Sequence, residues 1–137
     1  MASSAQLFEL IGIPPLSELD LALLTERGIP TKSVAVLKER GLTFTEISDI
    51  IVSPRTLKHR NARKEPLSHD ETDRVVRVAR ILSLAEEIFA SREKALKWLR
   101  LPDDRLENRT PLTMLITESG GRLVENMLWQ IDEGVFA

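Results

Sequence analysis

Helix start signals recur along this chain. Two of them are capping boxes, in which a Ser or Thr side chain and a Glu three residues later each satisfy a free backbone N–H group. The pairs are Thr43 with Glu46 and Ser68 with Glu71. No stretch shows the sustained alternation of apolar and polar residues that marks strands. We therefore predict an all-α fold.

The longest expected helix runs from Ser68 to about Ala90 and carries one apolar stripe. Spacings of three and four residues place these side chains on one face: Val75, Val78, Leu82, Ala85 and Phe89. Further helices are expected after Ser17, Thr31, Ser53, Ser91, Pro111 and Thr117. We expect these shorter helices to pack on the stripe of the long one.

The composition argues against an enzyme. The 137 residues include no Cys, no Tyr and only two His. Disulfides, thiolate metal sites and a Cys nucleophile are therefore excluded, and the usual acid–base groups are scarce. We find no nucleophile–base pair, metal cluster or Gly-rich phosphate loop, so we expect no catalytic residue and no cofactor.

Neither a membrane span nor a secretory signal is apparent. No apolar run approaches the roughly 18–20 residues that a membrane span needs. The first residues lack the positive charge and the long apolar stretch of a secretory signal. We expect a cytoplasmic protein that does not contact a membrane.

Charge is unevenly distributed around a net value of −2. Residues 53–64 contain five basic residues and no acid, whereas residues 101–137 contain three arginines and seven acids. A basic segment in an acidic chain indicates one polyanion-binding surface and a different partner elsewhere. We place the domain boundary near residue 90, giving domains over 1–90 and 91–137, although the long helix can bridge them.

Residues 43–64, TFTEISDIIVSPRTLKHRNARK, have the pattern of a helix-turn-helix. A helix over about 44–51 meets a tight turn at 52–54, and a basic helix follows, which in such motifs enters the DNA major groove. Leu57 is the only large apolar residue of this second helix and should face inward. The residues expected at DNA lie on the opposite face and its flanks: Arg55, Thr56, Lys58, His59, Arg60, Arg63 and Lys64. The alternative is a solvated basic helix without a ligand.

Three more arginines recur at every third position: Arg74, Arg77 and Arg80. We interpret them as surface residues that pair with the acids at positions 70–73, in preference to a second DNA contact.

Two long stretches resemble the sequence patterns of one bacterial family. SPRTLKHRNARKEPLSHDETDRVVRVAR resembles S-x-R-T-L-x-R-R … L-S-x-x-E-x-D-R-x-x-R, and WLRLPDDRLENRTPLTMLITESGGRLVENMLWQIDEGVFA resembles W-L-x-x-P … G-V-F-A. Together they resemble the Xre/MbcA/ParS family of type II antitoxins, which are encoded beside RES-domain toxins. The resemblance extends from about residue 28 to the end. Asn108 stands where the family often has Gly, and Trp129 stands where a smaller residue is common.

The resemblance implies an Xre-like helix-turn-helix that binds the promoter of its own operon, followed by a toxin-binding domain. The resemblance also implies that the partner toxin degrades NAD and that the antitoxin itself has no catalytic activity. The alternative is a stand-alone transcription regulator that answers to a small ligand. Because one helix-turn-helix makes a small footprint, we expect a homodimer on a two-fold operator, within a hetero-oligomeric complex with the toxin. The apolar segments 7–13 and 19–24 are candidate dimer surfaces.

The final helix is expected to place one apolar face in the core: Leu123, Val124, Met127, Leu128 and Ile131. Trp129 lies at the edge of this face, where it either covers a neighbouring helix or anchors an interface. Gly120 and Gly121 each cost roughly 1 kcal/mol of helix propensity relative to Ala. A close helix–helix approach would offset this cost, unless the helix begins only at Arg122.

The chain ends on an apolar tail after an acidic turn. Phe136 either packs on its own domain or inserts into the toxin beside its NAD cleft, where nearby carboxylates could meet phosphate-binding cations. The residues expected at the toxin are Trp129, Asp132, Glu133, Gly134, Val135, Phe136 and Ala137.

Overall fold

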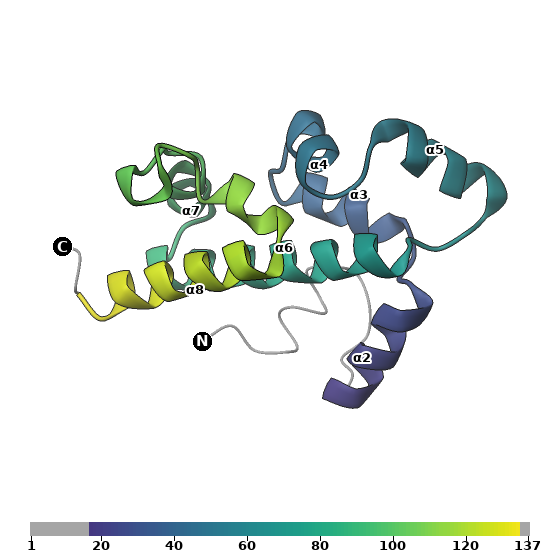
Figure 1. Cartoon of the computed structure of the whole chain (residues 1–137), viewed down its shortest axis with the longest axis horizontal. Helices are drawn as coiled ribbons and strands as arrows, with labels where there is room; N and C mark the ends of the chain where they lie inside the picture. The colour runs from purple at the N-terminus through teal and green to yellow at the C-terminus, as the bar shows by residue number, and fades with distance from the viewer. Residues whose placement is uncertain (1–16, 135–137) are drawn as a thin grey trace.

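The computed structural model describes residues 17–134, and the regular elements in this range are helices (Figure 1). The α-helices are α2 (Glu18–Arg27), α3 (Lys32–Glu39), α4 (Phe44–Ile50), α5 (Pro54–Arg63), α6 (His69–Phe89), α7 (Arg92–Leu99) and α8 (Glu118–Asp132). Two short 3₁₀ helices, η1 (Asp104–Leu106) and η2 (Leu112–Ile116), precede α8. The predicted all-α fold is confirmed.

Both predicted capping boxes are formed. The Thr43 hydroxyl accepts from the Glu46 backbone N–H at 3.1 Å, and the Glu46 carboxylate accepts from the Thr43 N–H at 2.8 Å. Ser68 and Glu71 make the same pair of hydrogen bonds at 3.2 and 2.9 Å. Each box satisfies two N–H groups that have no partner inside the helix, which fixes where α4 and α6 begin.

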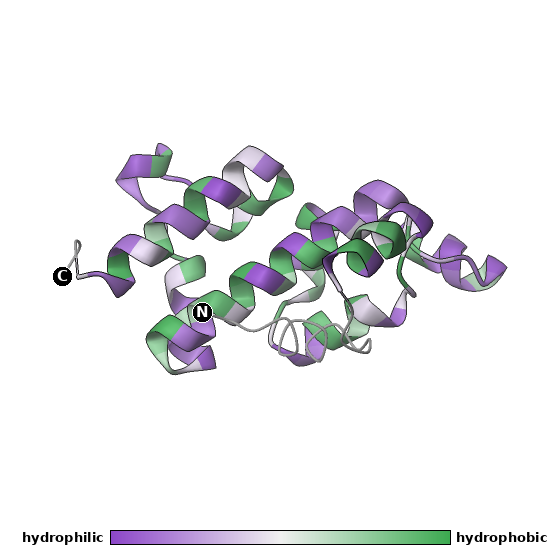
Figure 2. Cartoon of the chain, turned by 90° about the horizontal axis from the view of Figure 1, so that it is seen from below, coloured by the Kyte–Doolittle hydropathy of each residue, from purple (hydrophilic) through white to green (hydrophobic). Residues whose placement is uncertain are grey.

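The long helix α6 contacts α2, α3, α7, α8 and η2, which confirms the prediction for these elements. The helix α4 instead makes its main contacts with α3 and η2. Val75, Val78 and Ala85 are fully buried on it. Contacts with α7, α8 and η2 cover one part of α6, and α2 and α3 contact another (Figure 1). Hydrophilic and hydrophobic residues follow one another along the ribbons, as in amphipathic helices (Figure 2). A single core therefore runs from the helix-turn-helix into the C-terminal half.

Arg77 corrects the expectation of a surface arginine. Its side chain is only 4% exposed, and its guanidinium donates to the carbonyl oxygens of Leu115 at 3.1 Å and Ile116 at 3.3 Å. It pairs with Asp73, as predicted, but also with Glu118 at 3.4 Å. The prediction that Arg77 is exposed was wrong, because its guanidinium is buried where it donates to backbone carbonyls at the end of η2. Arg77 therefore joins α6 to the C-terminal half.

The neighbouring arginines differ from Arg77 in their surroundings. Arg74 donates to the carbonyl oxygen of Ile51, just after α4, at 2.9 Å. Arg80 is exposed on α6. Equal spacing along the sequence therefore leads to three different environments.

The two glycines of α8 are explained by close packing. The helix begins before both of them, so the alternative of a late start at Arg122 is wrong. A Cβ atom on Gly120 would lie 1.9 Å from the carbonyl oxygen of Met114, and one on Gly121 would lie 2.8 Å from Cδ of Arg77. The absence of side chains lets α8 approach η2 and α6 closely, which offsets the lower helix propensity.

The apolar face of α8 is narrower than predicted. Val124, Met127 and Leu128 are buried and Ile131 is half-buried, but Leu123 is 43% exposed. The expectation that Leu123 belongs to the core was wrong, because α8 contacts α6 and η2 along a stripe that excludes it.

The loop before η2 explains one departure from the family pattern. Asn108 has φ +65° and Glu107 has φ +55°, both in the left-handed region. Glycine adopts this region at no steric cost, and asparagine is enriched there among the other residues. Asn108 can therefore occupy a turn in which the family often has Gly.

Candidate functional site

The helix α5 projects from the body of the molecule (Figure 1). The Ser53 hydroxyl caps it by accepting from the Thr56 N–H at 3.1 Å, and Pro54 occupies its first turn. Leu57 is half-buried and packs against the core, as predicted, but no residue of α5 is fully buried. The helix-turn-helix therefore presents most of its second helix to solvent.

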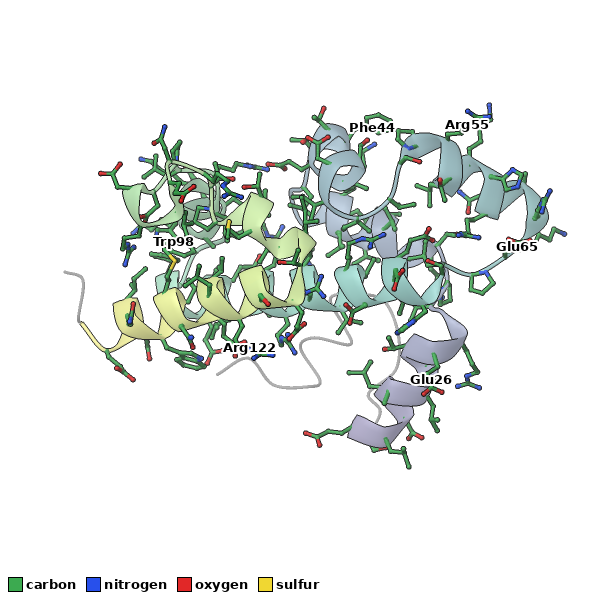
Figure 3. The ribbon with its side chains drawn as sticks, in the orientation of Figure 1. Glu26, Phe44, Arg55, Glu65, Trp98 and Arg122 are labelled. Carbon is green, nitrogen blue, oxygen red and sulfur yellow. The ribbon has the colours of Figure 1, made fainter. Side chains whose placement is uncertain are left out.

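Five of the seven residues expected at DNA are exposed on or beside α5: Arg55, Lys58, His59, Arg63 and Lys64. Figure 3 shows Arg55 directed away from the body of the molecule. Thr56 is half-buried, and its hydroxyl oxygen accepts from the Ser53 hydroxyl at 2.9 Å. Arg63 is 62% exposed although its guanidinium lies 3.9 Å from Glu65. The exposed cations form a surface suited to an anionic partner.

Arg60 occupies a different position from the one expected. Its Nε and Nη2 donate to the two carboxylate oxygens of Glu71 at 3.0 and 3.1 Å, and Nη1 lies 3.4 Å from Glu65. Only 24% of its side chain is exposed. Arg60 therefore fastens α5 to the start of α6, and we leave it out of the proposed DNA surface.

The Arg60 pair also determines the ionisation of Glu71. Burial acts to raise the pKa of this carboxyl, but the hydrogen bonds from Arg60 and from the Ser68 N–H outweigh it, so the pKa lies below its usual value. The same pair raises the pKa of Arg60. Glu71 thus serves a helix cap and an interhelical ion pair at once.

A second arginine links the helix-turn-helix to the C-terminal half. Arg100, at the end of α7, donates to both carboxylate oxygens of Glu46 at 2.8 Å and to the carbonyl oxygen of Gly41 at 2.8 Å. Burial acts to raise the pKa of Glu46, yet the Arg100 hydrogen bonds bring it below its usual value. Sequence reasoning missed this link, since 54 residues separate the partners.

The residues expected at the toxin lie at the end of α8. Trp129 is half-buried and packs against the core, while Asp132, Glu133 and Gly134 are exposed. Gly134 has φ +79°, so the backbone leaves the helical conformation there. Val135, Phe136 and Ala137 lie outside the described residues. The described end of α8 is therefore an acidic, solvent-facing surface.

Comparison with known proteins assigns both halves. Residues 20–80 match the model of the antitoxin Xre-like helix-turn-helix domain, and residues 84–134 match the antitoxin Xre/MbcA/ParS C-terminal toxin-binding domain. An antitoxin Xre from Pseudomonas putida KT2440 is 40% identical over 131 residues, covering 95% of this chain and 82% of the relative. The chain belongs to the Xre antitoxin family.

Two more relatives are less similar to this Xre-family antitoxin. The antitoxin Xre of Photorhabdus laumondii is 29% identical over 137 residues, covering 96% of this chain and 91% of the relative. The Prs ADP-ribosylating antitoxin of Sphingobium sp. YBL2 is 30% identical over 91 residues, covering 60% of this chain and 57% of the relative.

The family establishes the general function. This protein is an antitoxin of a toxin–antitoxin system, with a helix-turn-helix domain and a domain that binds a toxin partner. Among residues 17–134, no group of three or more His, Cys, Asp or Glu side chains is arranged to hold a metal ion. No helix in this part of the chain is long and apolar enough to cross a membrane.

Proposed function

We propose that this antitoxin neutralises a RES-domain toxin that degrades NAD, and that it represses its own operon by binding promoter DNA. The toxin role belongs to residues 91–137 and the DNA role to residues 1–90. The observation that carries the proposal is the separation of two exposed surfaces of opposite charge, cationic on α5 and acidic at the end of α8. Each lies within the domain whose family model fits its role.

The toxin surface begins at the acidic end of α8. The exposed carboxylates of Asp132 and Glu133 suit the cations that an NAD-binding cleft presents to the substrate's phosphates. The tail, residues 135–137, follows Gly134 and adds an apolar side chain, Phe136, to fill a pocket there. The name of the Sphingobium relative refers to ADP-ribosylation, a chemistry that consumes NAD, which supports an NAD-using toxin as the target.

Deletion of residues 135–137 tests this role. We expect co-expression with the toxin from the adjacent reading frame to rescue growth and NAD levels with the full chain, but not with the truncated chain. The melting temperature should change little. The control is Asp70→Asn, a change at an exposed residue in the other domain. If the truncated antitoxin neutralises the toxin as well as the full chain, the tail is not the inhibitory element.

The DNA surface consists of the exposed cations of α5. Changing Arg55 to Ala should alter operator specificity and cost about 1–3 kcal/mol if its guanidinium reads a base. Changing Lys58 to Ala should weaken binding to all sequences and reduce the slope of log K against log salt by about one. A protein that shows no salt-dependent binding to its own promoter would lack this role.

We also propose that the antitoxin acts as a homodimer in the cytoplasm, where both promoter DNA and NAD are found. Leu19 and Leu23 are 67% and 44% exposed and lie one turn apart on α2, within the candidate dimer segment 19–24. The other candidate, 7–13, lies outside the described residues. Light scattering of the wild type and of a Leu19→Ser, Leu23→Ser variant tests this assembly.

A further inference from the structure

Phe44 is exposed in a way that the core does not explain. It is the first residue of α4, and 60% of its surface is exposed. The other large apolar residues exposed among residues 17–134 are aliphatic. Phe44 and Arg55 project on the same side of the helix-turn-helix in Figure 3. An exposed ring at this point is suited to contact a partner.

The surface around Phe44 combines apolar and cationic groups. Phe44, Pro54 and Leu57 line a groove of about 450 Å³ between α3, α4 and α5. Lys32 and Lys38 also line it, and none of its lining residues is acidic. A complementary partner therefore carries negative charge and presents C–H surface beside it.

The sugar–phosphate backbone of DNA has this alternation of phosphates and apolar deoxyribose faces. In a helix-turn-helix the first helix crosses the backbone while the second lies in the major groove. We propose that Phe44 packs against the deoxyribose surface of the operator and that Lys38, on the same groove, holds an adjacent phosphate. This inference rests on the proposed DNA binding and extends the interface from α5 to α3 and α4.

Three kinds of DNA contact leave different signatures in binding data. A contact to a base edge changes the ratio of affinities for operator and unrelated DNA. A contact to a phosphate changes the dependence of affinity on salt. An apolar contact to deoxyribose changes neither, because it reads no base and releases no counterion. Phe44 is therefore distinguishable from its neighbours by measurement.

The experiment measures the Kd of the full-length protein for its promoter fragment and for an unrelated duplex over a range of salt concentrations. Phe44→Ala should raise both Kd values by about five- to tenfold, because most of the ring surface is free to be buried on DNA. The salt slope and the affinity ratio should stay at the wild-type values. Lys38→Ala should lower the salt slope by about one on both duplexes.

The controls separate this inference from the proposed function. Leu101→Ala removes a side chain that is 57% exposed in the other half, and should leave both Kd values unchanged. Circular dichroism and thermal unfolding verify that each variant is folded. An unchanged Kd for Phe44→Ala, or a loss confined to the operator, overturns the inference while the Lys58→Ala effect still supports DNA binding. A wild-type protein that binds neither duplex overturns both.

Discussion

The helices α5 and α8 are both amphipathic but are held in opposite ways. α5 has ten residues, none of them buried, and polar bonds at Arg60 fasten it to the body. α8 has fifteen residues, five of them buried, and two glycines let it pack closely on its neighbours. A helix that touches the core mainly through one half-buried residue, here Leu57, can devote the rest of its sequence to a ligand. A helix that completes the core must meet its partner with the residues that remain outside.

The two helices also differ in the interactions that hold them against the rest of the protein. The position of α8 depends on van der Waals contact and on the buried guanidinium of Arg77, both sensitive to small changes. The position of α5 depends on a half-buried ion pair with Glu71. We therefore expect substitutions on the α8 side to affect unfolding more than substitutions that loosen α5.

The largest expected loss of stability follows from Arg77→Ala. Removing this guanidinium leaves the carbonyls of Leu115 and Ile116 without their donor and opens a void beside Gly121. We expect the free energy of unfolding to fall by roughly 3 kcal/mol, measured by urea denaturation. Arg80→Ala is the matched control, since Arg80 lies one turn along α6 but is exposed. Equal effects from the two variants would show that Arg77 does not join the halves.

Gly120→Ala should have the next largest effect. The added methyl would lie 1.9 Å from the carbonyl oxygen of Met114, so α8 or η2 must move. We expect a loss of roughly 2 kcal/mol in the same assay, although alanine favours helix. Ser119→Ala tests propensity alone, because Ser119 is exposed in the same turn. A Gly120→Ala variant as stable as the wild type would mean that α8 does not approach η2 this closely.

The sequence predicted what is local. Helix starts were readable because a cap and its partner lie three residues apart, as at Thr43 and Ser68. The helix-turn-helix was readable because Leu57 was the only large apolar residue of a basic helix. The inward direction of Leu57 then followed from the period of a helix.

The sequence did not predict which charges are solvated. Arg77, Arg80 and Arg100 are the same residue type, yet only the fold brings Arg77 to carbonyls 38 and 39 residues away and Arg100 to Glu46. Arg60 was expected at DNA because helix periodicity gives the direction in which a side chain points. It does not reveal that Glu71 lies in that direction. Leu123 was assigned to the core because the width of the contact depends on the neighbouring elements.

A smaller effect is expected from loosening α5 through Glu71→Gln. The change removes the charge that Arg60 meets at 3.0 Å but keeps the size of the side chain. We expect a loss of about 1–2 kcal/mol at neutral pH. Asp70→Asn is the control, because Asp70 is its exposed neighbour.

The pH dependence of stability provides a second measurement on the same variant. The pKa of Glu71 is lowered in the folded protein, so its contribution is fully present above the ordinary value of about 4.5 and is lost as the pH falls through the folded pKa. Glu71→Gln should therefore differ from the wild type at pH 7 and converge with it in acid. A constant difference across this range would mean that the ion pair does not hold α5.

The smallest expected change in stability is that of Leu123→Ala, on the outer side of α8. Because the side chain is 43% exposed, we expect the free energy of unfolding to change by less than about 1 kcal/mol. If α8 meets the toxin with the residues that the core leaves outside, affinity for the toxin should still fall about fivefold, measured by calorimetry. Val124→Ala, a change at the adjacent buried residue, should instead reduce stability first. If Leu123→Ala instead loses stability and keeps its affinity for the toxin, Leu123 contributes to the core and not to toxin binding.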